Sequence, residues 1–123
     1  MRILIADDHY AVRQGLIQLV RDAFPDAELG EASDAPSLIR QCLSGDWSFV
    51  VTDLAMPGGG AMPAIKAIKE KKPGLPIVVV STHSNTVYED WTLKGGADYF
   101  LAKDSLSAQL GSLLKKLVAE RGL

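Results

Sequence analysis

Short apolar runs alternate along the chain with longer segments in which apolar residues recur every three or four positions. Four of the runs, at residues 3–6, 49–52, 75–80 and 99–102, have the length of buried strands. The run at 75–80 is apolar throughout and rich in β-branched residues, which is typical of a strand covered on both faces. Residues 27–31 are predicted to form a fifth strand, which is weaker because it contains a glycine.

A helical period follows each of these strands. It is formed by five sets of apolar residues: Val12, Leu16, Leu19, Val20 and Ala23; Leu38, Ile39 and Leu43; Met62, Ile65 and Ile68; Val87, Trp91 and Leu93; and Leu106, Leu110, Leu113, Leu114, Leu117 and Val118. Ser33 or Asp34 is the expected N-cap of the second helix, ahead of Pro36. The outer face of the third helix is predicted to be basic and solvated, with Lys66, Lys69, Lys71 and Lys72.

Strict alternation of five strands with five helices indicates a parallel sheet with helices on both faces, because right-handed crossovers must cover it. A closed barrel would need eight such units. We therefore expect an α/β fold with a single doubly wound, open sheet. No repeat or flexible linker divides the 123 residues, so the whole chain, 1–123, is expected to be one domain.

Composition narrows the function classes. The chain is 47% hydrophobic and 23% charged, as globular proteins are, and its formal net charge of −2 argues against nucleic acid as the main partner of this domain. A single cysteine, Cys42, excludes an internal disulfide and is expected to be a small buried residue. The apolar runs are too short for a signal peptide or a membrane span, so a cytoplasmic protein is expected.

Polar residues follow four of the five predicted strands. Asp7 and Asp8 come after the first strand and Asp53 after the third, Ser81 and Thr82 come after the fourth, and Lys103 comes after the fifth. These groups should meet, because sites in open α/β sheets form beyond the carboxyl ends of the strands. Clustered carboxylates repel one another unless a cation shares the site, and oxygen ligands suit Mg²⁺. Asp53 is placed to attack phosphorus, with Lys103 and the metal neutralising the transferred group. The pattern predicts a phosphoaspartate site.

Four segments carry a family resemblance: residues 3–9 (ILIADDH), 53–58 (DLAMPG), 80–81 (VS) and 96–104 (GADYFLAKD). They resemble the receiver (CheY-like) domain of two-component response regulators, and the NarL/FixJ (LuxR-type) subfamily in particular. The similarity covers essentially the whole chain. It implies a flavodoxin-like sheet with strand order 2-1-3-4-5.

The resemblance also implies a role for each acidic position. Asp53 would accept a phosphoryl group from the phosphohistidine of a sensor histidine kinase. Asp8 would bind Mg²⁺ directly and Asp7 largely through water, with Asp53 and the backbone carbonyl of Ala55 completing the protein's share of the coordination. Such a protein is a phosphoacceptor that assists its own phosphorylation and dephosphorylation, and is not an enzyme in the ordinary sense.

Three further positions would convert phosphorylation into a signal. Lys103 would pair with the phosphoryl group and Ser81 would donate a hydrogen bond to it. Tyr99 would be an aromatic switch that is coupled to Ser81 and moves inward on activation. Switching would change the surface formed by the fourth helix, the fifth strand and the fifth helix. The subfamily implies a phosphorylation-dependent homodimer and control of transcription through a C-terminal helix-turn-helix domain, which is absent from this chain.

Some positions depart from the family pattern. Gly58, Gly59 and Gly60 predict a more mobile loop after the third strand. Thr82 adds bulk next to Ser81 and is expected to slow phosphoryl access. His83 is either a surface residue or a group that positions water for hydrolysis of the phosphoaspartate.

The same residues allow other interpretations. The acidic site could be unused, in which case the chain is a pseudo-receiver that acts as a constitutive interaction or dimerisation module. Asp7 and Asp8 could simply cap the first helix, and Trp91 could lie in the core or in a partner contact. A phosphatase similar to the haloacid dehalogenase superfamily is disfavoured, because its Asp-x-Asp would follow the first strand. A flavodoxin-like cofactor site is disfavoured because acids there would repel a phosphate.

Overall fold

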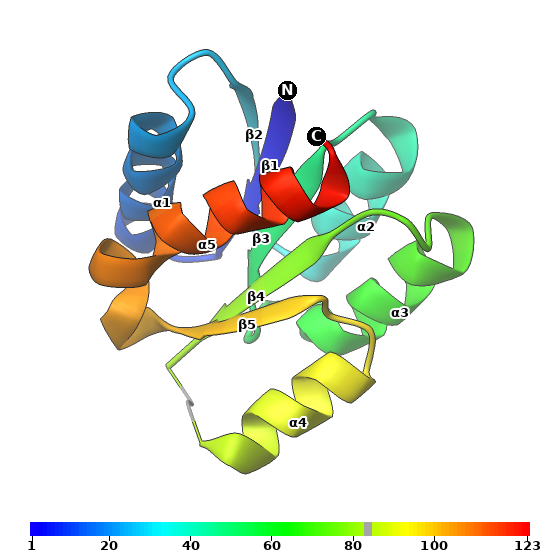
Figure 1. Cartoon of the computed structure of the whole chain (residues 1–123). Coiled ribbons are helices and arrows are strands. Elements are labelled where there is room, and N and C mark those ends of the chain that lie inside the picture. The colour runs from blue at the N-terminus through cyan, green and yellow to red at the C-terminus, as the bar shows by residue number, and fades with distance from the viewer. Residues whose placement is uncertain (83–84) are drawn as a thin grey trace.

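The computed structural model describes residues 1–82 and 85–123, which form one parallel sheet with helices on both faces (Figure 1). The strand order is β2-β1-β3-β4-β5, as predicted. The strands are β1 (Arg2–Ala6), β2 (Glu28–Ala32), β3 (Phe49–Asp53), β4 (Ile77–Ser81) and β5 (Tyr99–Ala102). The helices are α1 (Tyr10–Ala23), α2 (Ala35–Ser44), α3 (Ala61–Lys71), α4 (Thr86–Lys94) and α5 (Leu106–Arg121), and a short 3₁₀ turn, Lys103–Ser105, precedes α5.

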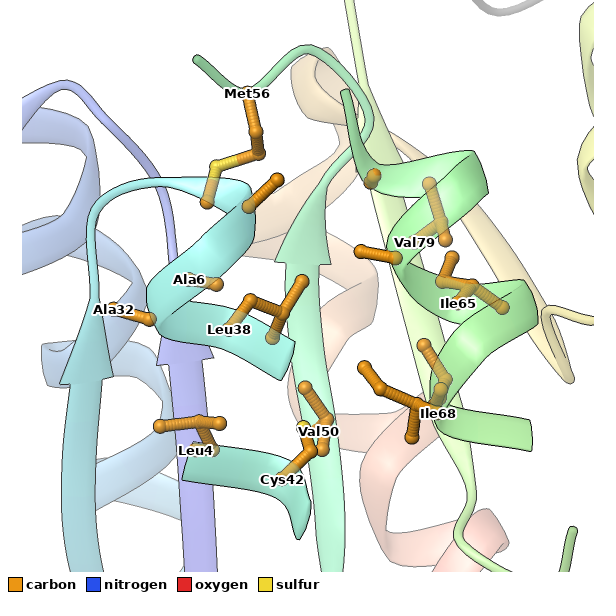
Figure 2. Close-up of a cluster of buried hydrophobic side chains, with 14 of the residues drawn as sticks. Leu4, Ala6, Ala32, Leu38, Cys42, Val50, Met56, Ile65, Ile68 and Val79 are labelled. Atoms are coloured by element: carbon orange, nitrogen blue, oxygen red, sulfur yellow. The ribbon is translucent and has the colours of Figure 1, made fainter. Parts of the chain in front are cut away.

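Each face of the sheet has its own apolar core. Successive side chains of a strand point to opposite faces, so Ile3 and Ile5 pack under α1 and α5, whereas Leu4 and Ala6 pack under α2 and α3. Figure 2 shows the second of these cores, where Leu38 of α2 and Ile65 of α3 reach the sheet. Burial on both faces explains why the strand sequences read as continuous apolar runs.

Helix α2 begins as the sequence predicts. Asp34 is the N-cap, and its Oδ1 accepts a hydrogen bond of 2.7 Å from the backbone N–H of Ser37. Cys42 is fully buried, and burial raises the pKa of its thiol to about 12, so it stays neutral. Leu43 was expected to face the core but is exposed, because Cys42 and Leu38 form the buried stripe of this helix.

The glycine in β2 makes room for an aromatic ring. A Cβ on Gly30 would overlap Cη2 of Trp47, which covers this part of the strand. The indole N–H of Trp47 donates to the backbone carbonyl of Gln41 at 2.7 Å, and Arg2 lies over its ring. The weak β-forming sequence of β2 is therefore the result of close packing by a neighbouring side chain.

Helix α4 differs from the expected pattern. Val87 and Leu93 were predicted to belong to the apolar side of this helix, and Trp91 was expected either in the core or in a partner contact. All three are exposed. Thr92 is the buried residue of this helix, and its hydroxyl donates to the carbonyl of Tyr88 at 2.7 Å. The helix packs along β5 at the edge of the sheet, where little apolar surface is available to cover it (Figure 1).

The amino ends of the strands carry a second group of charges, formed around Asp98. Its Oδ2 accepts hydrogen bonds from Lys69 Nζ at 2.7 Å and from the backbone N–H of Ile77 at 2.8 Å. Its Oδ1 accepts from Arg121 Nη2 at 3.1 Å. The prediction of a solvated lysine face was therefore wrong for Lys69, and also for Lys72, whose Nζ donates to the carbonyl of Gly45 at 2.7 Å.

Both chain ends lie at this amino edge of the sheet (Figure 1). The backbone N–H of Ser48 donates to the carbonyl of Arg2, and Leu123 lines a hollow together with the same serine. Among the described residues, no helix has the length and apolarity to cross a bilayer.

Candidate functional site

The carboxyl ends of β1 and β3 bring three aspartates together. Oxygen atoms of Asp7, Asp8 and Asp53 and a ring nitrogen of His9 all lie within 4.8 Å of one another. Asp7 is fully buried and Asp53 nearly so, whereas Asp8 is exposed to solvent. β1 and β3 are neighbours in the sheet, but the helices that follow them cover opposite faces. In open α/β sheets, ligands bind in the crevice that this arrangement leaves at the carboxyl ends of the two strands.

A single lysine reaches both buried carboxylates. Lys103 begins the 3₁₀ turn after β5, and its Nζ lies 3.2 Å from Asp7 Oδ2 and 3.2 Å from Asp53 Oδ1. One ammonium is thus shared by two acids, and the third acid, Asp8, lies at the solvent side of the cluster. With all three carboxyl groups ionised, the cluster has three negative charges and only the one positive charge of Lys103 beside them.

Burial and the surrounding charges together change the pKa of Asp53. Burial raises the pKa of its carboxyl group above the ordinary value, and the neighbouring Asp7 raises it further. Lys103 and a backbone hydrogen bond from Ala55 lower the pKa but do not offset burial. A bound cation at the cluster would favour the ionised form, which is the form that can attack an electrophile.

Hydrogen bonds fix Asp7 in its place. Its Oδ1 accepts from the backbone N–H of His9 at 2.8 Å, and its backbone carbonyl accepts from Arg13 Nη1 at 2.8 Å. The His9 ring is largely exposed, with Nδ1 3.2 Å from Asp8 Oδ1. We assigned no role to His9 from the sequence, although its position directly after two site aspartates was the available signal.

The donor set fits a hard divalent cation. Three carboxylates supply oxygen ligands, and the exposed side of Asp8 leaves room for the waters that Mg²⁺ retains. Ala55 lies two residues after Asp53 in an exposed turn. Ser81 ends β4 beside the cluster, is 2% exposed and pairs in register with Ala102, next to Lys103.

A comparison with known proteins agrees with this geometry. The family model for the response regulator receiver domain matches residues 3–115. This chain belongs to the response regulator receiver family. The receiver is 38% identical over 104 residues to the nitrate/nitrite response regulator protein NarL of Escherichia coli (strain K12), covering 83% of this chain and 47% of NarL.

Solved structures give the same assignment. A LuxR-family two-component response regulator from Aurantimonas sp. SI85-9A1 superposes with a TM-score of 0.89 at 28% identity, covering 98% of this chain and 86% of that one. RcsB from Salmonella enterica serovar Typhimurium, bound to promoter rprA in the presence of phosphomimetic BeF₃⁻, has a TM-score of 0.83 at 29% identity, covering 95% and 67%. The receiver spans about half the length of the curated relatives it matches.

The receiver's structure does not bring Tyr99 to Ser81. Tyr99 packs on the α1 and α5 face, and its hydroxyl donates to Glu120 Oε2 at 3.0 Å. Ser81 continues the alternation of Ile77 and Val79 and so belongs to the opposite face. The strand register places Tyr99 beside Val78, three residues before Ser81 and about 10 Å along the strand.

Phe100 is the aromatic residue on the same face as Ser81. It packs against the core under α2 and α3, and it pairs in register with Val79, which shares that face. The sequence held a signal for this assignment that we did not use. Counting alternate positions along the two paired strands places residue 100, and not residue 99, on the same side as residue 81.

The glycine loop of the receiver is held at several points. Leu54 donates its N–H to the carbonyl of Val80, Ala61 donates to the carbonyl of Leu54, and Ala35 donates to the carbonyl of Pro57. Gly58 has φ 87°, and a Cβ there would lie 2.6 Å from Pro36 Cδ. Glycine is therefore required by backbone conformation and close packing.

Thr82 is exposed, directly after buried Ser81. His83, considered as a group that could position water, lies outside the described residues.

Proposed function

We propose that this receiver domain accepts a phosphoryl group on Asp53 with Mg²⁺ bound beside it, and that the phosphoryl group changes the surface presented to partners. The observation that carries this proposal is the charge imbalance of the site. Two buried carboxylates share the ammonium of Lys103, and a third acid borders them. A site of this kind is completed by a divalent cation and by an anionic group that Lys103 can reach.

The proposed transfer uses residues already in position. A carboxylate oxygen of Asp53 forms a bond to phosphorus while the bond from phosphorus to its leaving group breaks. The leaving group is the imidazole of a kinase phosphohistidine, or acetate when acetyl phosphate is the donor. Asp7, Asp8, Asp53 and the carbonyl of Ala55 would hold Mg²⁺, which supplies positive charge to the phosphoryl oxygens when bound.

Lys103 and Ser81 would respond to the new charge. A phosphoryl group carries roughly −1.5 to −2 charges at pH 7, so Lys103 is drawn from Asp7 toward it and Ser81 donates a hydrogen bond to an equatorial oxygen. We infer that Phe100, which shares the face of Ser81, follows this movement. Tyr99 instead links β5 to the end of α5 through Glu120.

The partners we propose follow from the family. A sensor histidine kinase would donate the phosphoryl group, and phosphorylation would favour a homodimer. Transcription would be controlled through a DNA-binding domain outside this chain, as supported by the RcsB relative solved bound to a promoter. We place the protein in the cytoplasm, where such kinases present their phosphohistidine.

Intact-protein mass after incubation with acetyl phosphate and Mg²⁺ tests the phosphoacceptor. Wild type should gain one phosphoryl group, and the gain should be lost in Asp53→Asn and in the presence of a chelator. Asp104→Asn is the matched control, because this exposed acid follows Lys103 but lies outside the acidic cluster. A folded wild type that takes up no phosphoryl group would favour a pseudo-receiver instead.

Lys103→Ala separates phosphorylation from its consequence. The variant should still gain the phosphoryl mass, because Asp53 and the metal ligands are intact. It should not change its oligomeric state on phosphorylation, as followed by sedimentation. A variant that changes size as the wild type does would contradict the role given to Lys103.

A further inference from the structure

Arg13 connects the acidic cluster to strand β2. It is the fourth residue of α1, and its Nη1 donates to the backbone carbonyl of Asp7 at 2.8 Å, while its Nε donates to Glu31 Oε1 at 2.8 Å. Its guanidinium also lies over the ring of Tyr10, 5.6 Å from the centroid. These three contacts leave the side chain of Arg13 only 14% exposed, so its position is well defined.

The carbonyl that Arg13 binds lies between two of the site acids. Strand β2 ends at Ala32, whose carbonyl accepts the N–H of Asp7 at 3.0 Å. The donor to the carbonyl of Asp7 is then the guanidinium of Arg13 instead of a strand residue. This carbonyl belongs to the planar peptide that joins Asp7 to Asp8. Arg13 therefore fixes the plane from which the side chain of Asp8 leaves the backbone.

The two acids of this segment are held in different ways. The carboxylate of Asp7 is buried and is fixed directly, by the N–H of His9 at 2.8 Å and by Lys103 Nζ at 3.2 Å. The carboxylate of Asp8 lies 3.2 Å from Nδ1 of His9, but the side chain of His9 is itself 68% exposed. The direction of Asp8 thus depends mainly on the backbone that Arg13 holds.

On the basis of the Mg²⁺ site proposed above, we propose that Arg13 is a positioning residue for metal binding. It holds the peptide between Asp7 and Asp8 so that the carboxylate of Asp8 faces the cation, and it does not touch the cation itself. Groups that orient metal ligands in this way raise metal affinity, and their loss typically weakens binding by about tenfold or more.

The charge of Arg13 gives the test a definite sign. A guanidinium next to the acidic cluster repels a cation, so electrostatics alone predicts that Arg13→Gln binds Mg²⁺ more tightly than wild type. A positioning role predicts the opposite result, because the loss of the bond to Asp7 frees the peptide before Asp8. The direction of the change in affinity therefore decides between the two effects.

Arg2 provides a matched control within the same strand. It lies at the amino end of β1, pairs with Glu28 of β2 at 3.4 Å and lies over the ring of Trp47, 4.6 Å from the centroid. Arg2 and Arg13 thus have the same kinds of partner, a carboxylate of β2 and an aromatic ring. Arg2→Gln removes the same charge at the end of β1 far from the cluster, and should leave the Mg²⁺ affinity within about twofold of wild type.

Titration of the ¹⁵N-labelled chain with MgCl₂, followed at the amides of Asp8 and His9, measures the affinity. Arg13→Gln should weaken Mg²⁺ binding by about tenfold. Arg13→Lys keeps the charge but lacks the planar fork that binds Asp7 and Glu31 together, so its affinity should lie between those of Arg13→Gln and wild type. If Arg13→Gln does not fold, Arg13→Lys makes the comparison.

Hydrogen exchange without metal gives a second readout. The N–H of His9 donates to Asp7 Oδ1, so its amide should exchange faster in both Arg13 variants than in wild type or Arg2→Gln. Exchange of the amides of β4, on the far side of β3, should be unchanged, because a positioning role acts locally.

Three outcomes would overturn the proposal. They are an equal or tighter Mg²⁺ affinity in the Arg13 variants, an equal loss of affinity in Arg2→Gln, and an unchanged exchange rate at His9. A wild type that binds no Mg²⁺ would overturn the metal site itself and the role of Arg13 with it. Wild-type binding with unaltered Arg13 variants would overturn only the role of Arg13.

Discussion

Asp53 and Asp98 lie at opposite edges of the same sheet, and each contacts a lysine. Around Asp98 the cations are in excess, since Lys69 and Arg121 both bind one carboxylate that also accepts the N–H of Ile77. Around Asp53 the acids are in excess, since Lys103 is shared with Asp7. The first arrangement ties α3, β4 and α5 to the start of β5, and the second is the one for which we propose a cation and a phosphoryl group.

This contrast separates structural from functional charge. A saturated carboxylate stabilises the native state and gains little from any added ligand. A cluster with too few cations costs stability until a ligand supplies the missing charge. Both pairs look alike in the sequence, as one Asp and one Lys far apart, so the local balance of charge distinguishes them.

The largest expected effect is at the saturated aspartate. Asp98→Ala removes the common partner of Lys69, Arg121 and the N–H of Ile77, and should lower the free energy of unfolding by about 2 to 3 kcal/mol. Urea denaturation measures the change. Asp26→Ala is the control, because it removes an exposed acid from the turn before β2, at the same edge, and should cost under about 0.5 kcal/mol. Equal losses in the two variants would show that Asp98 is no structural hub.

We expect Mg²⁺ to stabilise the protein by binding at the cluster around Asp53 and not at Asp98. Mg²⁺ at about ten times its dissociation constant should stabilise wild type by about 1.4 kcal/mol, and should stabilise the Asp98→Asn variant equally. Asp8→Asn should lose most of this gain. Thermal unfolding with Mg²⁺ and with a chelator gives both values, and an undiminished gain in Asp8→Asn would contradict the assigned site.

Replacing the aspartate with asparagine should change thermal stability in opposite directions at Asp53 and at Asp98. Without metal, Asp53→Asn should raise the midpoint of thermal unfolding, because it removes a buried charge whose pKa is raised by burial and by Asp7. Asp98→Asn should lower the midpoint. A lower midpoint for Asp53→Asn would mean that Lys103 already balances the site.

The smallest effect is a pH dependence with a definite sign. The pKa of Asp53 is higher in the folded state, so its contribution favours folding below the unfolded value of about 3.9 and is lost as pH rises through the folded pKa. The stability advantage of Asp53→Asn over wild type should therefore be small at low pH and grow as pH rises. Urea midpoints of both proteins in chelator, across the acid range, measure it. A constant difference would argue against a raised pKa.

The resemblance to receiver domains supplied the strand order, and the sequence pattern was sufficient to predict the strands and the meeting of Asp7, Asp8, Asp53 and Lys103. These depend on element order and on the rule that carboxyl ends of parallel strands share one edge, so no side-chain detail was needed. The proposed roles of these residues in phosphoryl transfer stay predictions until the mass measurement is made.

Side-chain direction and tertiary pairing were harder to predict. Tyr99 and Phe100 are consecutive, so an error of one position moved the proposed switch to the wrong face of the sheet. Lys69 looked like one of four surface lysines until the fold placed Asp98 beside it. Trp91 has helical spacing, but α4 lies at an edge where its apolar side meets no core.

The position of the chain ends has a practical consequence for protein engineering. Both termini flank Ser48 at the edge of the sheet opposite Asp53, about 17 Å away along five-residue strands. A short linker could join them in a circular permutant, or a host protein could receive the whole receiver as an insertion, without covering the acidic cluster. Reporter proteins fused to both ends would stay close together.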